Sequence, residues 1–146
     1  MNLRSGVDLV SVERFSAALQ RHGQRLLQRL FTETERQQSG GRTESLAVRF
    51  AAKEAAAKAL GCGIGEIGWR EMEVVEDEKG APHLRFHGNA AQKVHQQKWV
   101  SWSLSLTHAQ GMALAMLVAL CDESPLATGG DQPAPSGATE RDLPAR

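Results

Sequence analysis

One segment near the middle of the chain carries charged side chains at helical spacing. Within Ser45–Leu60, SLAVRFAAKEAAAKAL, Glu54 lies four residues before Lys58, and Arg49 lies four residues before Lys53. Residues four apart are neighbours on a helix surface, so one short helix displays three cations and one carboxylate. Taken alone, this pattern is more typical of a solvated helix face with one intrahelical ion pair, which stabilises a protein only slightly.

The residues that follow this helix favour a binding site. Glycines alternate with other residues at Gly61, Gly63 and Gly65. Glycine lets the backbone approach a ligand closely and leaves its N–H groups unobstructed, so cations beside such a loop suit a phosphate. A helix cap followed by a flexible turn is the alternative explanation. A dinucleotide-binding loop is excluded, because these glycines follow a helix instead of joining a strand to a helix.

Two further polar residues lie in expected strands. Asp8 is the only carboxylate of an opening strand, and it points to the face opposite Val7 and Leu9. Asp8 and Glu54 together would satisfy Mg²⁺, which typically takes one or two protein carboxylates and completes its shell with waters and substrate phosphates. His108 ends a serine-rich strand just before a turn, where side chains commonly reach a site. Taken singly, an aspartate such as Asp8 is more often a helix cap or surface group, and a histidine such as His108 is more often structural or exposed.

Hydrophobic periodicity predicts the elements that must position these residues. We expect an opening strand around 7–9, a helix over 12–31 that Gly23 can divide, a central helix over 45–60 closed by Gly61, a hairpin over 71–87 that turns at 79–80, a helix over 89–98 capped by Asn89, and a hairpin over 101–120 that turns near 110–111. This order favours an α+β fold, with a mostly antiparallel sheet packed against the long central helix.

Composition excludes several classes of function. Lys+Arg and Asp+Glu both number 17, so no global basic field attracts nucleic acid. Cys62 and Cys121 are too few for a disulfide framework and lack the paired spacing of a zinc site. The opening residues hold no signal-like apolar stretch, and the longest apolar run, Met112–Leu120, is too short to span a bilayer. We therefore expect a cytoplasmic protein with no nucleic-acid or membrane partner.

A change in composition divides the chain of 146 residues near Cys121. The segment 122–146 holds four of the five prolines, five acidic residues and two basic ones, and hardly any large apolar side chain. Such a composition buries too little apolar surface to offset the entropy of ordering. We expect one domain over 1–121 and a disordered tail over 122–146.

Three segments together resemble the holo-acyl-carrier-protein synthase group of phosphopantetheinyl transferases. Gly6–Leu9 followed by Val12–Arg14 is similar to the family's opening strand with its metal aspartate. Arg49–Lys58 has the family signature of an aromatic residue, two small residues, Lys-Glu, a small residue and a further Lys. Ser105–Ala109 is similar to the late strand that ends in histidine near the bound coenzyme. The likeness runs from about residue 3 to residue 120, with the motifs in family order.

The resemblance implies an Mg²⁺-dependent enzyme. Such an enzyme moves the 4′-phosphopantetheine arm of coenzyme A onto a serine hydroxyl of apo-acyl carrier protein and releases adenosine 3′,5′-bisphosphate. It also implies a homotrimer whose active sites lie at subunit interfaces, so that His108 can complete a neighbour's site. A carrier of fatty-acid biosynthesis is favoured by family analogy alone.

The resemblance also implies roles for single residues. The catalytic residues would be Glu54, Lys58 and His108, and the metal ligands would be Asp8 and Glu54. The coenzyme would contact Arg49, Lys53, Lys58, Gly61, Gly63, Gly65, Thr107 and His108. The proton of the incoming serine would go to Glu54 directly or to a metal-bound water that Glu54 orients, and the residues do not decide between these two.

A row of arginines on the expected first helix suggests a partner surface. On an ideal helix, Arg14, Arg21, Arg25 and Arg29 fall within a stripe of roughly 80° beside apolar residues. Acyl carrier proteins are acidic, so we expect Arg14, Arg21 and Arg25 to steer and dock the carrier. The alternative is a solvated basic face, which a break at Gly23 would favour.

Two other classes of function stay open. One is a noncatalytic module that binds coenzyme A or a nucleotide, and the other is an adaptor that only docks carrier proteins. The pairing of Asp8 with Glu54 speaks against the first, because a module that only binds has less need of a metal. An adaptor would not need Lys53, Glu54 and Lys58 together.

Overall fold

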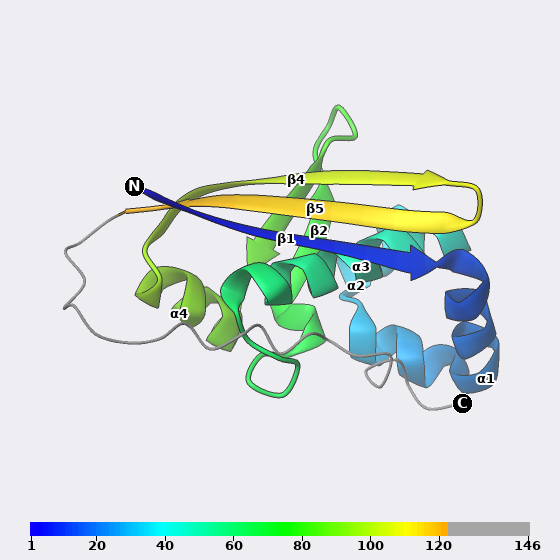
Figure 1. Ribbon diagram of the computed structural model, residues 1–146. Coiled ribbons are helices and arrows are strands. Elements are labelled where there is room, and N and C mark those ends of the chain that lie inside the picture. The colour runs from blue at the N-terminus through cyan, green and yellow to red at the C-terminus, as the bar shows by residue number, and fades with distance from the viewer. Residues whose placement is uncertain (123–146) are drawn as a thin grey trace.

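The computed structural model of the chain describes residues 1–122, so the expected tail lies outside the described residues, apart from Asp122. The elements in chain order are β1 (Asn2–Ser11), α1 (Val12–Leu30), α2 (Glu33–Ser39), α3 (Thr43–Leu60), the 3-10 helix η1 (Trp69–Glu71), β2 (Met72–Glu76), β3 (Pro82–Phe86), α4 (Gly88–Gln96), β4 (Trp99–Ala109) and β5 (Met112–Cys121). This is the expected α+β order, with α2 and η1 added (Figure 1).

Every pairing between the described strands is antiparallel, which confirms the expected sheet type. A three-stranded sheet has the order β1-β5-β4, and β2 and β3 form a separate two-stranded sheet. The helix α3 packs along one face of the three-stranded sheet, and α1, α2 and β2 also contact α3 (Figure 1). The long central helix therefore lies in the middle of the molecule, as expected.

Small residues let α3 lie unusually close to the sheet. A Cβ atom placed on Gly6 would come within 1.8 Å of the Ala55 carbonyl oxygen, so only glycine fits at this point of β1. On β5, Ala113 and Ala115 face α3 and are fully buried. Because α3 is covered almost along its whole length, charged side chains on it must find partners within the protein.

Local sequence signals mark the helix ends, but one short helix was not predicted and one N-cap was assigned to the wrong residue. Gly61 ends α3 in the left-handed conformation, with φ 68°, and Gly23 interrupts α1 with non-helical angles, so both expectations are confirmed. The seven-residue helix α2 was not predicted, because it is too short to show periodicity; its signal is the capping box that begins at Thr32. The cap assigned to Asn89 is wrong, because α4 begins one residue earlier and His87 occupies the N-cap position.

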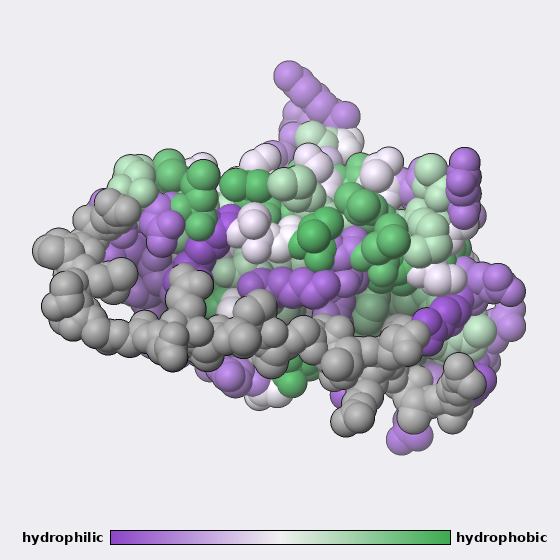
Figure 2. Space-filling view, in the orientation of Figure 1, coloured by the Kyte–Doolittle hydropathy of each residue, from purple (hydrophilic) through white to green (hydrophobic). Residues whose placement is uncertain are grey.

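The face of the three-stranded sheet that points away from α3 is apolar and exposed. We call this surface the outer sheet face and define it by Leu3, Val7 and Leu9 of β1 and Met116 of β5, all of which are exposed. Hydrophobic side chains gather along this side of the molecule in Figure 2. Contiguous apolar surface of this kind marks an interaction site. Among the helices of residues 1–122, none combines the length and the apolar character needed to cross a membrane.

Candidate active site

Five of the predicted site residues divide into two groups on opposite sides of α3. Residues nine apart on a helix point in roughly opposite directions. Accordingly, Lys58 bonds to β1, whereas Arg49 bonds to β2. Asp8 on β1 and His108 on β4 lie at opposite edges of the sheet, with β5 between them. We name the groups the carboxylate half-site, Asp8, Glu54 and Lys58, and the arginine half-site, Arg49 and His108. The arginine half-site also includes Arg42, which the motifs did not predict and which lines the same cavity.

The carboxylate half-site brings two acids and one amine to the β1 side of α3. The Lys58 ammonium lies 2.9 Å from Asp8 Oδ1 and donates to the Val7 carbonyl oxygen at 3.0 Å. Burial raises the pKa of the Asp8 carboxyl, while the hydrogen bond and charge of Lys58 act in the opposite direction. Glu54 lies one helical turn before Lys58 and is only 4% exposed. Asp8 thus faces α3, as its strand position predicts.

The solvated-face interpretation of α3 is wrong. Arg49 is 2% exposed, Lys53 is fully buried and Glu54 is nearly so. The ion-pair partner of Lys58 is the Asp8 carboxylate of β1, at a sequence distance that no helical spacing reveals. The charges of this helix therefore belong to tertiary contacts, and burial makes each of them costly unless it is partnered.

Asp8 and Glu54 are the residues of the carboxylate half-site that would hold a magnesium ion, with waters and a phosphate in its other positions. Within residues 1–122, no group of three or more His, Cys, Asp or Glu is placed to hold a metal. Mg²⁺ needs fewer protein ligands, because one or two carboxylates suffice when waters and substrate phosphates supply the other ligands. Asp8 already holds a cation, the Lys58 ammonium, and Glu54 adds a second carboxylate on the same side of α3.

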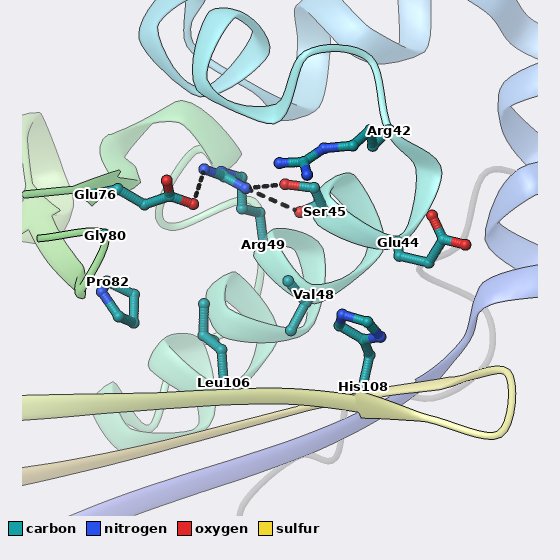
Figure 3. Close-up of a pocket in the computed structure, with 10 residues that line it drawn as sticks. All are labelled: Arg42, Glu44, Ser45, Val48, Arg49, Glu76, Gly80, Pro82, Leu106 and His108. Carbon is teal, nitrogen blue, oxygen red and sulfur yellow. Dashed lines mark hydrogen bonds and ion pairs between the residues drawn. The ribbon is translucent and has the colours of Figure 1, made fainter.

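The arginine half-site lines a cavity of about 380 Å³ on the β4 side of α3. The cavity is lined by Arg42, Glu44, Ser45, Val48, Arg49, Glu76, Gly80, Pro82, Leu106 and His108. In Figure 3, Leu106 and His108 rise from β4 toward α3, and Arg49 lies between Ser45 and Glu76. Nη1 of Arg49 donates to the carbonyl and hydroxyl oxygens of Ser45, and Nη2 donates to Glu76 at 3.0 Å.

This cavity suits a phosphate-bearing ligand. Arginine presents planar N–H donors that match phosphate oxygens, and two arginines and a histidine line the cavity. In the described part of the chain, the buried Nε–H of Arg49 has no hydrogen-bond partner. A buried donor of this kind gains free energy from an added acceptor. The predicted anion contacts of Arg49 and His108 are therefore placed together.

Lys53 lies in neither half-site. Its ammonium uses all three donors inside the protein, to Glu35 Oε2 at 2.8 Å, the Trp69 carbonyl at 2.9 Å and the Met72 carbonyl at 2.7 Å. Burial lowers the pKa of Lys53, and the neighbouring Glu35 carboxylate opposes this shift. Lys53 therefore ties α3 to α2, η1 and β2. Glu35 was missed from the sequence, although its capping-box spacing from Thr32 was visible.

Two other predicted coenzyme contacts lie away from the arginine half-site. Gly65, in the glycine segment 61–65, lines a second cavity of about 450 Å³ together with Arg29 and Arg70. Thr107 faces the outer side of the sheet, because adjacent strand residues alternate and its neighbour His108 faces α3. Within one subunit, the described structure does not bring these residues together with Arg49.

The arginine stripe on α1 is interrupted. Arg14, Arg21, Arg25 and Arg29 are all exposed, as expected for a partner surface. The arginines do not form the single continuous stripe of an ideal helix, because the non-helical angles of Gly23 divide α1 between Arg21 and Arg25. The surface consists of two shorter basic segments that meet at a kink.

Comparison with known proteins assigns the chain and its fold to a family. The model of the 4′-phosphopantetheinyl transferase superfamily matches residues 4–115, and the chain belongs to this family. A relative from Herpetosiphon aurantiacus, named holo-acyl-carrier-protein synthase, is 44% identical over 125 residues, which cover 81% of this chain and 98% of the relative. A relative of the same name from Salinispora arenicola is 48% identical over 117 residues, 78% of this chain and 94% of the relative.

Solved structures give the same result. The holo-acyl-carrier-protein synthase of Helicobacter pylori in complex with coenzyme A superposes with a TM-score of 0.73 at 30% identity, covering 80% of this chain and 99% of that one. The corresponding enzyme of Neisseria meningitidis has a TM-score of 0.73 at 32% identity, covering 80% of this chain and 97% of that one. The family resemblance of the three sequence motifs is confirmed.

Proposed function

We propose that this chain transfers the 4′-phosphopantetheine arm of coenzyme A to a serine hydroxyl of an apo-acyl carrier protein. The observation that carries the proposal is the presence of both half-sites in a member of this family: two carboxylates beside Lys58, and a cavity lined by Arg42, Arg49 and His108. The relatives' names and the coenzyme A complex of the Helicobacter pylori enzyme support it. A noncatalytic binding module or a docking adaptor has no use for both half-sites.

Each half-site has its own part in the reaction. The arginine half-site binds the phosphates of the nucleotide end, and the Lys58 ammonium donates to the pyrophosphate. The serine oxygen attacks the pantetheine-side phosphorus, the bond to adenosine 3′,5′-bisphosphate breaks, and the serine proton passes to Glu54 directly or through a water that Glu54 orients. Asp8 and Glu54 would hold Mg²⁺, which when bound neutralises charge on the leaving phosphate.

A complete site needs residues from two subunits of a homotrimer. Within one subunit, Lys58 and Arg49 point to opposite sides of α3, so one chain alone presents two incomplete halves. The outer sheet face is exposed and apolar, and pairing such faces in a closed ring is the usual way for subunits to bury them. We assign the carboxylate half-site of one subunit and the arginine half-site of its neighbour to the same active site.

The carrier docks on the basic surface of α1. Arg14, Arg21 and Arg25 are exposed beside the apolar core positions of the helix, and their charge complements an acidic partner. The kink at Gly23 gives this surface two orientations instead of one straight stripe.

The cytoplasm stays our prediction for the location of the enzyme.

Intact-protein mass spectrometry tests the proposed function. An apo-acyl carrier protein is incubated with this chain, coenzyme A and Mg²⁺, and a parallel sample contains a chelator. We expect the carrier to gain one phosphopantetheine in the first sample and none in the second, because phosphate transfer needs the charge of the metal. An unmodified carrier, despite a folded chain that binds coenzyme A, would favour the noncatalytic module.

A further inference from the structure

The arginine half-site contains a carboxylate that phosphate binding does not require. Oε1 of Glu76 lies 3.0 Å from Nη2 of Arg49, the more deeply buried arginine of the cavity (Figure 3). The Glu76 side chain is 38% exposed, whereas that of Arg49 is 2% exposed. The carboxylate therefore stands between the buried guanidinium and solvent, on the wall that a phosphate would approach.

Each partner of this ion pair has further hydrogen bonds that help to hold it in place. The backbone of Glu76 is fixed from α2, because its N–H donates to Gln38 Oε1 at 2.9 Å and its carbonyl accepts from Gln38 Nε2 at 3.2 Å. Arg49 is held independently by the carbonyl and hydroxyl oxygens of Ser45, one turn earlier on α3. Glu76 therefore contributes its charge to the cavity, and the hydrogen bonds to Ser45 orient the Arg49 guanidinium.

The charges that line the cavity nearly cancel. Arg42 and Arg49 contribute two positive charges, Glu44 and Glu76 contribute two negative ones, and His108 is the remaining titratable group. Glu76 is the acid paired directly with a guanidinium, so it cancels the cation that is least screened by water. A phosphate that enters the cavity meets a neutral pair at Arg49 instead of a free cation.

We propose that Glu76 weakens the hold of this cavity on phosphate-bearing nucleotides, so that the bisphosphate product leaves readily after transfer. The inference rests on the proposed function and adds to it a residue that limits product affinity. Removing the Glu76 charge leaves Arg49 without its carboxylate partner, so the ligand meets an unpaired guanidinium. The variant should bind adenosine 3′,5′-bisphosphate more tightly and should be inhibited more strongly by this product.

Calorimetric titration with adenosine 3′,5′-bisphosphate, adenosine 5′-monophosphate and uncharged adenosine tests the proposal. For Glu76→Gln, we expect the Kd of the bisphosphate to fall about tenfold, as for the gain of one partly screened charge, and the Kd of adenosine to stay unchanged. The matched control is Glu78→Gln, which removes the same charge from an exposed position on the β2–β3 turn, outside the cavity lining. The control should leave all three Kd values unchanged.

A second variant separates charge from positioning. Glu76→Asp keeps the carboxylate but shortens its stem, so it should bind the bisphosphate like the wild type if charge decides affinity. Unchanged bisphosphate binding by Glu76→Gln would overturn the proposal, and weaker binding would overturn it and make Glu76 a positioning residue for Arg49. Failure of the wild-type chain both to bind the bisphosphate and to modify a carrier would overturn the proposed function itself, and this inference with it.

Discussion

The variant Glu54→Gln is expected to lose about a thousandfold or more of the transfer rate while its fold stays intact. Glu54 is the buried carboxylate of the carboxylate half-site, one turn from Lys58 on α3. Glutamine keeps the shape but supplies neither a base for the serine proton nor an anionic metal ligand, and general base catalysis alone contributes about 10² to 10⁴. The rate is measured as carrier modified per unit time, at saturating coenzyme A and Mg²⁺.

The control for this variant is Glu78→Gln, which changes an exposed acid on the β2–β3 turn and should keep the wild-type rate. Thermal unfolding and carrier binding are measured alongside. Unchanged carrier binding with lost transfer agrees with a catalytic role for Glu54. Full turnover in a folded Glu54→Gln protein would contradict both roles of Glu54, as the base and as a metal ligand.

The second large effect is on stability. Replacing Lys53 with methionine should lower the free energy of unfolding by about 3 to 5 kcal/mol, because Glu35 keeps its charge in a fully buried position without its cation. Two backbone carbonyls, of Trp69 and Met72, also lose their ammonium donor. Urea unfolding followed by circular dichroism measures the change.

Two further variants test whether the loss of stability comes from the unpaired Glu35 carboxylate. Adding Glu35→Gln to Lys53→Met should recover part of the lost stability, since the uncompensated charge disappears with it. Lys79→Met, at an exposed turn position, should change stability by less than about 0.5 kcal/mol. If Lys53→Met unfolds like the exposed control and mainly raises the KM for coenzyme A, Lys53 is a coenzyme ligand after all.

Local patterns in the sequence predicted most of the fold. Alternating apolar residues predicted the strands around Val7 and Leu104, and Gly61 predicted the end of α3. The burial of α3 could not be predicted in this way, because alanines mixed with charges are also typical of a solvated helix. What buries α3 is the close approach permitted by Gly6 of β1 and by the alanines of β5, which is a long-range property.

The motifs named most residues of the candidate site, although not Arg42, and they did not show how these residues are arranged. The motif places Arg49, Lys53, Glu54 and Lys58 within ten residues, which suggests one cluster. Helical geometry already separates Arg49 from Lys58 by about half a turn, so the division into half-sites was visible in the sequence. The partner of Lys53 was not, because the Glu35 contact depends on how α2 packs against α3.

The central claim is that each active site combines the carboxylate half-site of one subunit with the arginine half-site of another. Mixing two inactive variants tests it most directly: Glu54→Gln, and the double variant Arg42→Gln/His108→Ala, which changes two exposed residues of the cavity. The two chains are coexpressed with different tags, and mixed trimers are isolated. Every mixed trimer contains one interface at which both halves are unaltered, so isolated mixed trimers should show about one third of the wild-type transfer rate. Mixed trimers no more active than either variant alone would contradict the account.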